Sequence, residues 1–304
     1  MSTSGCSKIE KVQDYIDKKG CVKMAYTQTL EVGELDIVSF CNLNCYSCNR
    51  FMDVFPVKDM MTVEQVKFFV DESIELDWPW RELRIMGGEP SIHPQFKEIL
   101  DEMMRLKRFK TSILIKVITN GTGKKVQERL KLVPPEFPVM NSMERYDTTH
   151  MELNSTTKKH VIPDFGNMWQ APIDRLPQKP SSTVEGFIPS TKIKEFDENT
   201  VYSCQVHQTC GLGISHNGIL PCGCGNAIGR VVGLDFYFKS LKEVTIEECH
   251  KRLEILCGLC GRNLNYTIPV RDNMEQSPFW EEAFEEYRKE VPKLPLYGVT
   301  TNES

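Results

Sequence analysis

The first half of the chain alternates between two spacings of apolar residues. Short apolar runs rich in β-branched residues predict buried strands, and the segments between them repeat apolar residues every three or four positions, as on one face of a helix. Strand and helix alternate three times, which is typical of an α/β fold with a parallel sheet and right-handed crossovers. The predicted strands cover 35–40, 83–86, 113–118 and 139–141, and the predicted helices begin near Val63, Pro94 and Lys124.

The second half has a weaker pattern. Residues 151–200 are polar and interrupted by prolines, which indicates a cover or linker. A hairpin is predicted around His216-Asn217-Gly218, and helices are predicted after Thr245 and from Ser277-Pro278. We therefore divide the chain into an N-terminal lead (1–30), an α/β core (31–150), the cover (151–200), a small cysteine-rich unit (201–262) and a helical tail (263–304).

Composition narrows the class of protein. Of 304 residues, 40% are hydrophobic and 26% are charged, which is ordinary for a folded globular protein. The net charge of −5 argues against a broad nucleic-acid-binding face, and no apolar run is long enough to predict a membrane span. The first residues lack the apolar segment of a signal peptide, so we expect a cytoplasmic protein. Twelve cysteines in such a chain indicate metal or redox chemistry more than disulfides.

Three cysteines lie close together directly after the first predicted strand. Cys41, Cys45 and Cys48 have the spacing C-x3-C-x2-C. Three thiolates on one tight loop can bind three irons of a 4Fe–4S cluster and leave the fourth iron open for another ligand. A structural zinc usually takes four protein ligands, which makes zinc the less favoured alternative.

A second motif follows at the end of the next predicted strand. Gly87-Gly88-Glu89-Pro90 combines two glycines, which allow a ligand close to the backbone, with a carboxylate that can accept a hydrogen bond from an amino group. With both motifs in this strand order, residues 31–150 resemble the radical S-adenosylmethionine (radical SAM) superfamily. The resemblance implies a partial (β/α) barrel whose cluster is chelated by SAM through its open iron.

The resemblance also assigns candidate cofactor-binding residues. It implies that Gly87, Gly88 and Glu89 contact the amino group of SAM. Thr119-Asn120-Gly121 recurs at a strand end in such enzymes, although this tripeptide is also ordinary turn chemistry. In parallel α/β folds, ligand-binding and catalytic residues lie at the carboxyl ends of the strands. We therefore include Thr119, Asn120 and Ser142 as candidate cofactor-binding residues.

A second group of cysteines lies between positions 204 and 260 and resembles the SPASM/twitch extension of radical SAM enzymes, which carries auxiliary 4Fe–4S clusters. No cysteine follows Cys260, so the number of cysteines in this group allows only one auxiliary cluster, as in the twitch variant. A zinc ribbon is the alternative. The expected ligands are Cys222, Cys257 and Cys260, with either Cys204 or Cys210 as the fourth and Cys224 in reserve.

The resemblance leaves the substrate and the reaction open. About thirty residues precede the first strand, too few for the peptide-recognition domain of many peptide maturases, so a small substrate is favoured over a peptide. Cys249 lies outside both ligand sets, eight residues before Cys257, and could donate a hydrogen atom to a substrate radical. The alternative is a small buried core residue.

With Cys249 as the donor, the layout is similar to that of neomycin C epimerase-type sugar epimerases. Epimerisation of a carbohydrate or aminoglycoside-like substrate is therefore favoured, and a dehydrogenase or a peptide maturase is the alternative. A zinc-ribbon binding module without catalysis is the least favoured class. The cluster chemistry also implies a flavodoxin- or ferredoxin-type reductant as partner.

Overall fold

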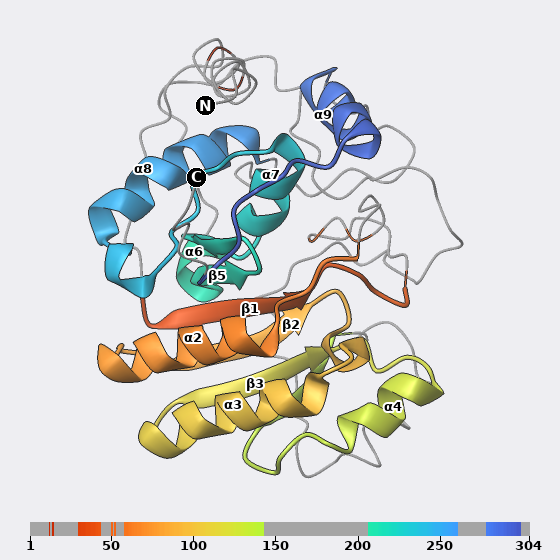
Figure 1. Cartoon of the computed structure of the whole chain (residues 1–304), viewed down its shortest axis with the longest axis vertical. Helices are drawn as coiled ribbons and strands as arrows, with labels where there is room; N and C mark the ends of the chain where they lie inside the picture. Colours follow the sequence, from red (N-terminus) through yellow and green to blue (C-terminus); the bar gives the residue numbers. More distant parts are fainter. Residues whose placement is uncertain are drawn as a thin grey trace.

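One mixed sheet organises the described part of the protein. The computed structural model describes residues 12, 14, 30–43, 50, 52, 58–142, 206–260 and 278–298. Within them, six strands form a sheet of order β4-β3-β2-β1-β5-β6 (Figure 1). All neighbouring pairs are parallel except β5 and β6, which form an antiparallel hairpin. The strands are β1 (Val32–Val38), β2 (Glu82–Gly87), β3 (Leu114–Thr119), β4 (Val139–Asn141), β5 (Leu212–Ser215) and β6 (Gly218–Leu220).

Two helices cover one face of the sheet. Helix α2 (Val63–Glu75) and helix α3 (Phe96–Phe109) connect the first three strands and lie side by side against them (Figure 1). Thr62 and Gln65 form a capping box, an arrangement that can be read directly from these two residues and that fixes where α2 begins. The apolar faces of both helices bury Phe69 and Ile99 against Leu35 and Ile85 of the sheet. Helix α4 (Lys124–Leu130) follows β3.

The carboxyl-terminal helices pack around a second apolar cluster. Figure 1 shows α7 (Gly225–Val232), α8 (Ile246–Leu259) and α9 (Pro278–Lys289) grouped beyond β1, on the side away from β3 and α4. Ile228, Leu256 and Trp280, one from each helix, are buried in this cluster. The remaining elements are short: α6 (Val206–Thr209) and the 3₁₀ turns η1 (Pro90–Ile92) and η2 (Leu241–Glu243).

The fold class predicted from the sequence is confirmed. The four strands expected in the first half are present, and the hairpin around His216-Asn217-Gly218 forms β5 and β6. One feature differs from the expected layout: β5 pairs in parallel with β1, so the hairpin extends the core sheet. The cover at 151–200 lies outside the described residues, and none of the described helices is long and apolar enough to cross a membrane.

Candidate active site

The carboxyl ends of β1 and β2 are held together beyond the last residue of each strand. The Gly88 N–H donates to the carbonyl oxygen of Val38 at 3.0 Å, and the Glu89 N–H donates to that of Phe40 at 3.1 Å. The parallel pairing therefore continues up to Cys41. As a result, the first cysteine of the C-x3-C-x2-C loop lies next to the second glycine of the GGEP segment.

Both glycines are required by this close approach. A Cβ atom at Gly88 would lie 1.9 Å from the carbonyl oxygen of Phe40, and one at Gly87 would lie 2.3 Å from that of Val38. Gly87 also has a φ of +129°, which side chains other than glycine rarely adopt. The glycines thus bring two backbone segments of the chain into direct contact, and the predicted approach of a ligand to them stays a prediction.

Glu89 joins the end of β2 to the end of β3. Its carboxylate is fully buried. It accepts hydrogen bonds from the Ser91 hydroxyl at 2.6 Å, the Thr119 hydroxyl at 2.9 Å and the Asn120 N–H at 2.8 Å. Burial raises the pKa of Glu89 above its ordinary value, and these hydrogen bonds oppose that rise. Both oxygens are engaged, so the predicted contact with the SAM amino group would require Glu89 to give up one of these bonds.

Asn120 connects the end of β3 to Cys41. Its side-chain Nδ2 donates to the Cys41 sulfur at 3.4 Å and to Asn42 Oδ1 at 2.9 Å. The backbone N–H of Leu43 also points at the Cys41 sulfur, at 3.4 Å. A half-buried sulfur that receives N–H donors fits a thiolate ligand, because such donors stabilise negative charge on sulfur. Cys45 and Cys48 lie outside the described residues, so their part in the ligand set stays a prediction.

Ser142 closes the same edge of the sheet from β4. Its backbone N–H and its hydroxyl both donate to the carbonyl oxygen of Thr119, at 2.8 and 3.1 Å. The residue is exposed at the carboxyl end of β4, where the strand-end argument places it. Its contact with a cofactor stays a prediction, and its observed role is to tie β4 to β3.

The face of the sheet opposite α2 and α3 carries a buried network of charged side chains. Glu34 of β1 pairs with both Arg50 and Arg84 of β2, the latter at 3.0 Å. Arg84 also pairs with Glu82 at 2.6 Å, and Lys116 of β3 reaches Glu82 at 3.0 Å. The network crosses three strands. With Asp36, which lies 3.2 Å from Arg50, three acidic and three basic side chains balance one another, as buried charges generally require.

The pKa values of the two carboxyls on β1 shift in opposite directions. Burial alone would raise the pKa of Glu34, but Arg50 and Arg84 hold it below its ordinary value. Burial raises the pKa of Asp36 to about 6, although Arg50 lies 3.2 Å away. This network was not predicted from the sequence. The signal was present as charged residues two positions apart on each strand, Glu34 and Asp36 on β1 and Glu82 and Arg84 on β2.

The second cysteine group lies beside this charged face. Arg84 Nη1 donates to the sulfur of buried Cys210 at 3.4 Å. The loop Cys222-Gly223-Cys224 lies over β1, because a Cβ at Gly223 would meet Glu34 Oε2 at 2.0 Å. A Cβ atom at the adjacent Gly225 would lie 2.8 Å from the Leu256 side chain of α8. The loop therefore lies against this helix, whose last turn contains Cys257 and which is followed by Cys260.

This placement leaves the auxiliary ligand set open. Cys204 lies outside the described residues, so the choice between Cys204 and Cys210 stays a prediction. Among the residues that the structure describes, no three histidine, cysteine or acidic side chains are arranged to hold a metal ion. Cys224, the reserve candidate, is buried in the second apolar cluster, against which Cys222 and Cys260 also pack.

Cys249 lies apart from these cysteines. It is fully buried on α8 within the apolar cluster that also contains Leu241, Val244 and the core of the sheet. Burial raises the pKa of the Cys249 thiol to about 12, so the group keeps its proton at neutral pH. The observed environment fits a small core residue, and the donor role stays a prediction.

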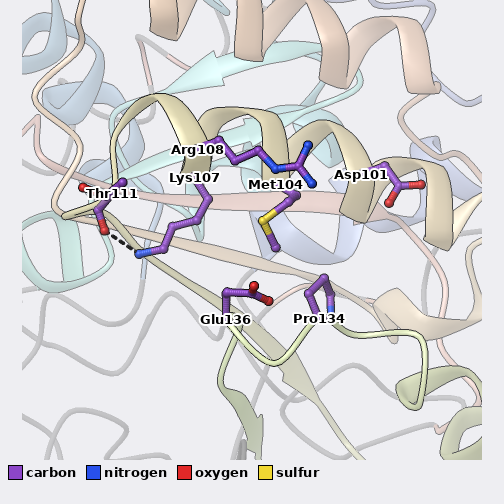
Figure 2. A pocket seen from close by; sticks show the side chains of 7 residues that line it. All are labelled: Asp101, Met104, Lys107, Arg108, Thr111, Pro134 and Glu136. Atoms are coloured by element: carbon purple, nitrogen blue, oxygen red, sulfur yellow. Dashed lines mark hydrogen bonds between the residues drawn. The ribbon is translucent and has the colours of Figure 1, made fainter.

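A pocket elsewhere on the surface does not belong to this site. Figure 2 shows it between the end of α3 and the segment that leads into β4, with Met104 and Pro134 facing across it. It has a volume of about 430 Å³ and mixed charges, including Lys107 and Glu136. Thr111 and Glu136 precede β3 and β4, so the pocket lies at the amino ends of these strands, opposite the edge that carries Cys41 and Asn120.

Comparison with known proteins identifies the domain. Residues 35–136 match the family model of the Radical SAM superfamily. The chain is 30% identical over 93 residues to human Molybdenum cofactor biosynthesis protein 1, a match that covers 29% of this chain and 13% of that protein. Residues 35–136 are therefore a radical SAM domain. This family implies SAM and one 4Fe–4S cluster as cofactors, and the environment of Cys41 fits the cluster.

Two solved structures share part of the fold. BtrN in complex with AdoMet and 2-DOIA is 14% identical with a TM-score of 0.45, over 82% of this chain and 98% of that chain. Streptococcus suis SuiB bound to the precursor peptide SuiA is 16% identical with a TM-score of 0.29, over 44% of this chain and 27% of that chain. At these scores the two likenesses add nothing to the family match.

Replacing Glu89 with alanine should weaken SAM binding about tenfold or more while the iron content is retained. The change leaves the buried donors of Ser91, Thr119 and Asn120 without their acceptor, so the ends of β2 and β3 lose their shared anchor. Isothermal titration of the reconstituted protein with SAM measures the effect. Glu89→Gln, which keeps one acceptor oxygen, should show a smaller loss. A SAM affinity unchanged in Glu89→Ala would contradict this positioning role.

Proposed function

We propose that this protein is a radical SAM enzyme that removes a hydrogen atom from a small, carbohydrate or aminoglycoside-like substrate. The observation that carries the proposal is the meeting of Cys41, Gly88 and Asn120 at one edge of the sheet, within the region that matches the family. When bound, the cluster and SAM supply a 5′-deoxyadenosyl radical, so the difficult chemistry belongs to the cofactors. The chain's own residues bind and orient them.

Each residue at this edge then has a defined task. Cys41 holds the cluster together with Cys45 and Cys48, and Asn120 orients Cys41 through its hydrogen bond to the sulfur. Gly87 and Gly88 let the main chain approach SAM closely. Glu89 fixes the position of this backbone through Ser91, Thr119 and Asn120.

We also propose one auxiliary 4Fe–4S cluster, bound by Cys222, Cys257, Cys260 and either Cys204 or Cys210. The contact between Gly225 and Leu256 supports it, because that contact brings the Cys222 loop to the end of α8. A cytoplasmic flavodoxin- or ferredoxin-type protein would supply electrons.

Anaerobic reconstitution followed by incubation with SAM and dithionite tests the proposed function. We expect a brown protein with about eight irons per chain, which is two clusters, and formation of 5′-deoxyadenosine. A colourless protein that binds zinc and leaves SAM intact would overturn the proposal in favour of a zinc-ribbon module. About four irons per chain with intact SAM cleavage would contradict only the proposal of an auxiliary cluster.

The fate of the substrate radical separates two reactions. For epimerisation, the hydrogen returns from the opposite face, and we propose Cys249 as its donor. The Cys249 thiol is protonated at neutral pH, which a hydrogen-atom donor requires, and the resulting thiyl radical would take up one electron and one proton to reset. For dehydrogenation, the substrate radical would pass one electron to the proposed auxiliary cluster and one proton to water, and no thiol is needed. The complete burial of Cys249 among apolar side chains favours this second reaction.

Replacing Cys249 with serine distinguishes these reactions. If the protein is an epimerase that uses Cys249, the variant should still form 5′-deoxyadenosine and abstract a hydrogen atom from the substrate, but it should yield no inverted product. The serine O–H bond is too strong to donate its hydrogen atom to the substrate radical. Incubation in deuterated water, followed by mass spectrometry of the product, measures this. Cys21→Ser is the control, since Cys21 belongs to neither predicted ligand set. Normal turnover of Cys249→Ser would make Cys249 a core residue and establish dehydrogenation as the reaction to pursue.

A further inference from the structure

A small polar cavity lies between the carboxyl ends of β1 and β5 and helix α7. Asp36 lines it from β1 and Ser39 from just beyond the end of β1, His216 from just beyond β5, and Asn226 and Arg230 from α7. Its volume of about 20 Å³ holds one water molecule or one hydroxyl group. Ser39 lies two residues before Cys41, so the cavity is next to the proposed cluster loop at the same edge of the sheet.

Several residues that line this cavity carry deeply buried polar atoms that lack a hydrogen-bond partner among the described residues. They are Nη1 of Arg50, Oδ1 of Asn226 and Nδ1 of His216. The residues are only 2%, 6% and 7% exposed. Oδ1 of Asp36 also makes no hydrogen bond to any described residue, although the Arg50 guanidinium lies 3.2 Å away. Buried polar groups are generally paired, so this set requires a partner from outside the described chain.

The chemistry of these atoms selects the partner. Arg50 Nη1 needs an acceptor, whereas Asn226 Oδ1 and Asp36 Oδ1 need a donor. A carboxylate would satisfy Arg50 but would face the Asp36 oxygen, and an ammonium group would face Arg50 and Arg230. A hydroxyl group both donates and accepts, carries no charge and has the size of the cavity.

We propose that this cavity is a substrate subsite that binds one hydroxyl group of a hydroxylated ring, with Arg50 donating a hydrogen bond to its oxygen and Asn226 Oδ1 accepting a hydrogen bond from its O–H. The proposal rests on the proposed function, because it places the substrate at the edge of the sheet that carries Cys41. It adds a substrate-binding role for Asn226 and Arg50, which the sequence did not single out. It also orients the ring relative to the cluster loop, since one hydroxyl is fixed at the end of β1.

Anaerobic titration calorimetry with neomycin, glucosamine and myo-inositol as probes tests the subsite. At least one probe should bind the SAM-loaded protein, and Asn226→Leu should weaken that binding about tenfold, because it removes the acceptor without opening space. Ser73→Ala is the matched control for stability. It removes a buried hydroxyl that bonds to Phe69 and Trp80 on the opposite face of the sheet, and it should leave probe affinity unchanged.

A crystal structure with the tightest probe gives the second measurement. A probe hydroxyl within hydrogen-bond distance of Arg50 Nη1 and Asn226 Oδ1 would support the subsite. Failure of all three probes to bind, equal affinity of the unchanged protein and Asn226→Leu, or a water molecule in the cavity with the probe elsewhere would overturn it. Formation of 5′-deoxyadenosine from SAM alone, measured on the same preparation, reports separately on the proposed function.

Discussion

Replacing Cys41 with alanine should abolish SAM cleavage and remove about half of the iron. Cys41 is the one predicted cluster ligand of this loop whose surroundings the structure describes, and three thiolates are the minimum that hold a 4Fe–4S cluster with one open iron. Losing one of them should release this cluster and leave the auxiliary cluster in place. Iron analysis, together with chromatographic detection of 5′-deoxyadenosine after addition of dithionite, measures both effects. The same result is expected for Cys45→Ala and Cys48→Ala.

The control for this experiment is Cys21→Ala, since Cys21 belongs to neither predicted ligand set. It should keep full iron content and full cleavage. Asn120→Ala is an informative intermediate variant, because it keeps all three thiolates but removes the Nδ2 donor to the Cys41 sulfur, together with the side-chain hydrogen bonds of Asn120 to Asn42 and Thr122. It should perturb the cluster without releasing it. Cleavage of SAM retained in Cys41→Ala would contradict the cluster assignment and, with it, the proposed function.

The part of the site that the sequence predicted depends on local signals. Each strand of the core ends at a recognisable motif: Cys41 after β1, Gly87-Gly88 after β2 and Thr119-Asn120 after β3. Parallel strands have their carboxyl ends at one edge of a sheet, so strand order and motif position suffice to bring these residues together. The capping box at Thr62 and the hairpin at His216-Asn217-Gly218 were predictable for the same reason, because each is encoded within a few neighbouring residues.

The part that the sequence did not predict depends on contacts between distant segments. Nothing near Leu212 indicates that β5 pairs with β1, a contact across more than 170 residues of chain. The partners of Glu34 also come from other segments of the chain. Arg50 follows the cysteine loop, and Arg84 lies on the next strand. Charged residues at alternate positions usually indicate a solvated strand face. Here the same pattern is buried because α7 and the Cys222 loop cover it.

The buried charge network gives the second prediction with a large effect. Glu34→Ala should lower the free energy of unfolding by about 3–5 kcal/mol, because it leaves the Arg50 and Arg84 guanidiniums buried without this carboxylate. Such a loss is a large fraction of the ~5–15 kcal/mol by which domains are typically stable. Chemical denaturation followed by circular dichroism under anaerobic conditions measures it, and the midpoint of thermal unfolding should fall by on the order of 10 °C.

An exposed ion pair supplies the matched control for Glu34. Glu247 pairs with Lys251 at 3.0 Å, with both side chains more than half exposed, so Glu247→Ala should cost less than about 1 kcal/mol. Glu34→Gln separates charge from shape, because the amide keeps the volume of the carboxyl but not its negative charge. It should remain strongly destabilising, since Arg50 and Arg84 still lose their shared counter-ion. A Glu34→Ala protein as stable as Glu247→Ala would show that the charge network contributes little to stability and that the Cys222 loop is held over β1 by packing alone.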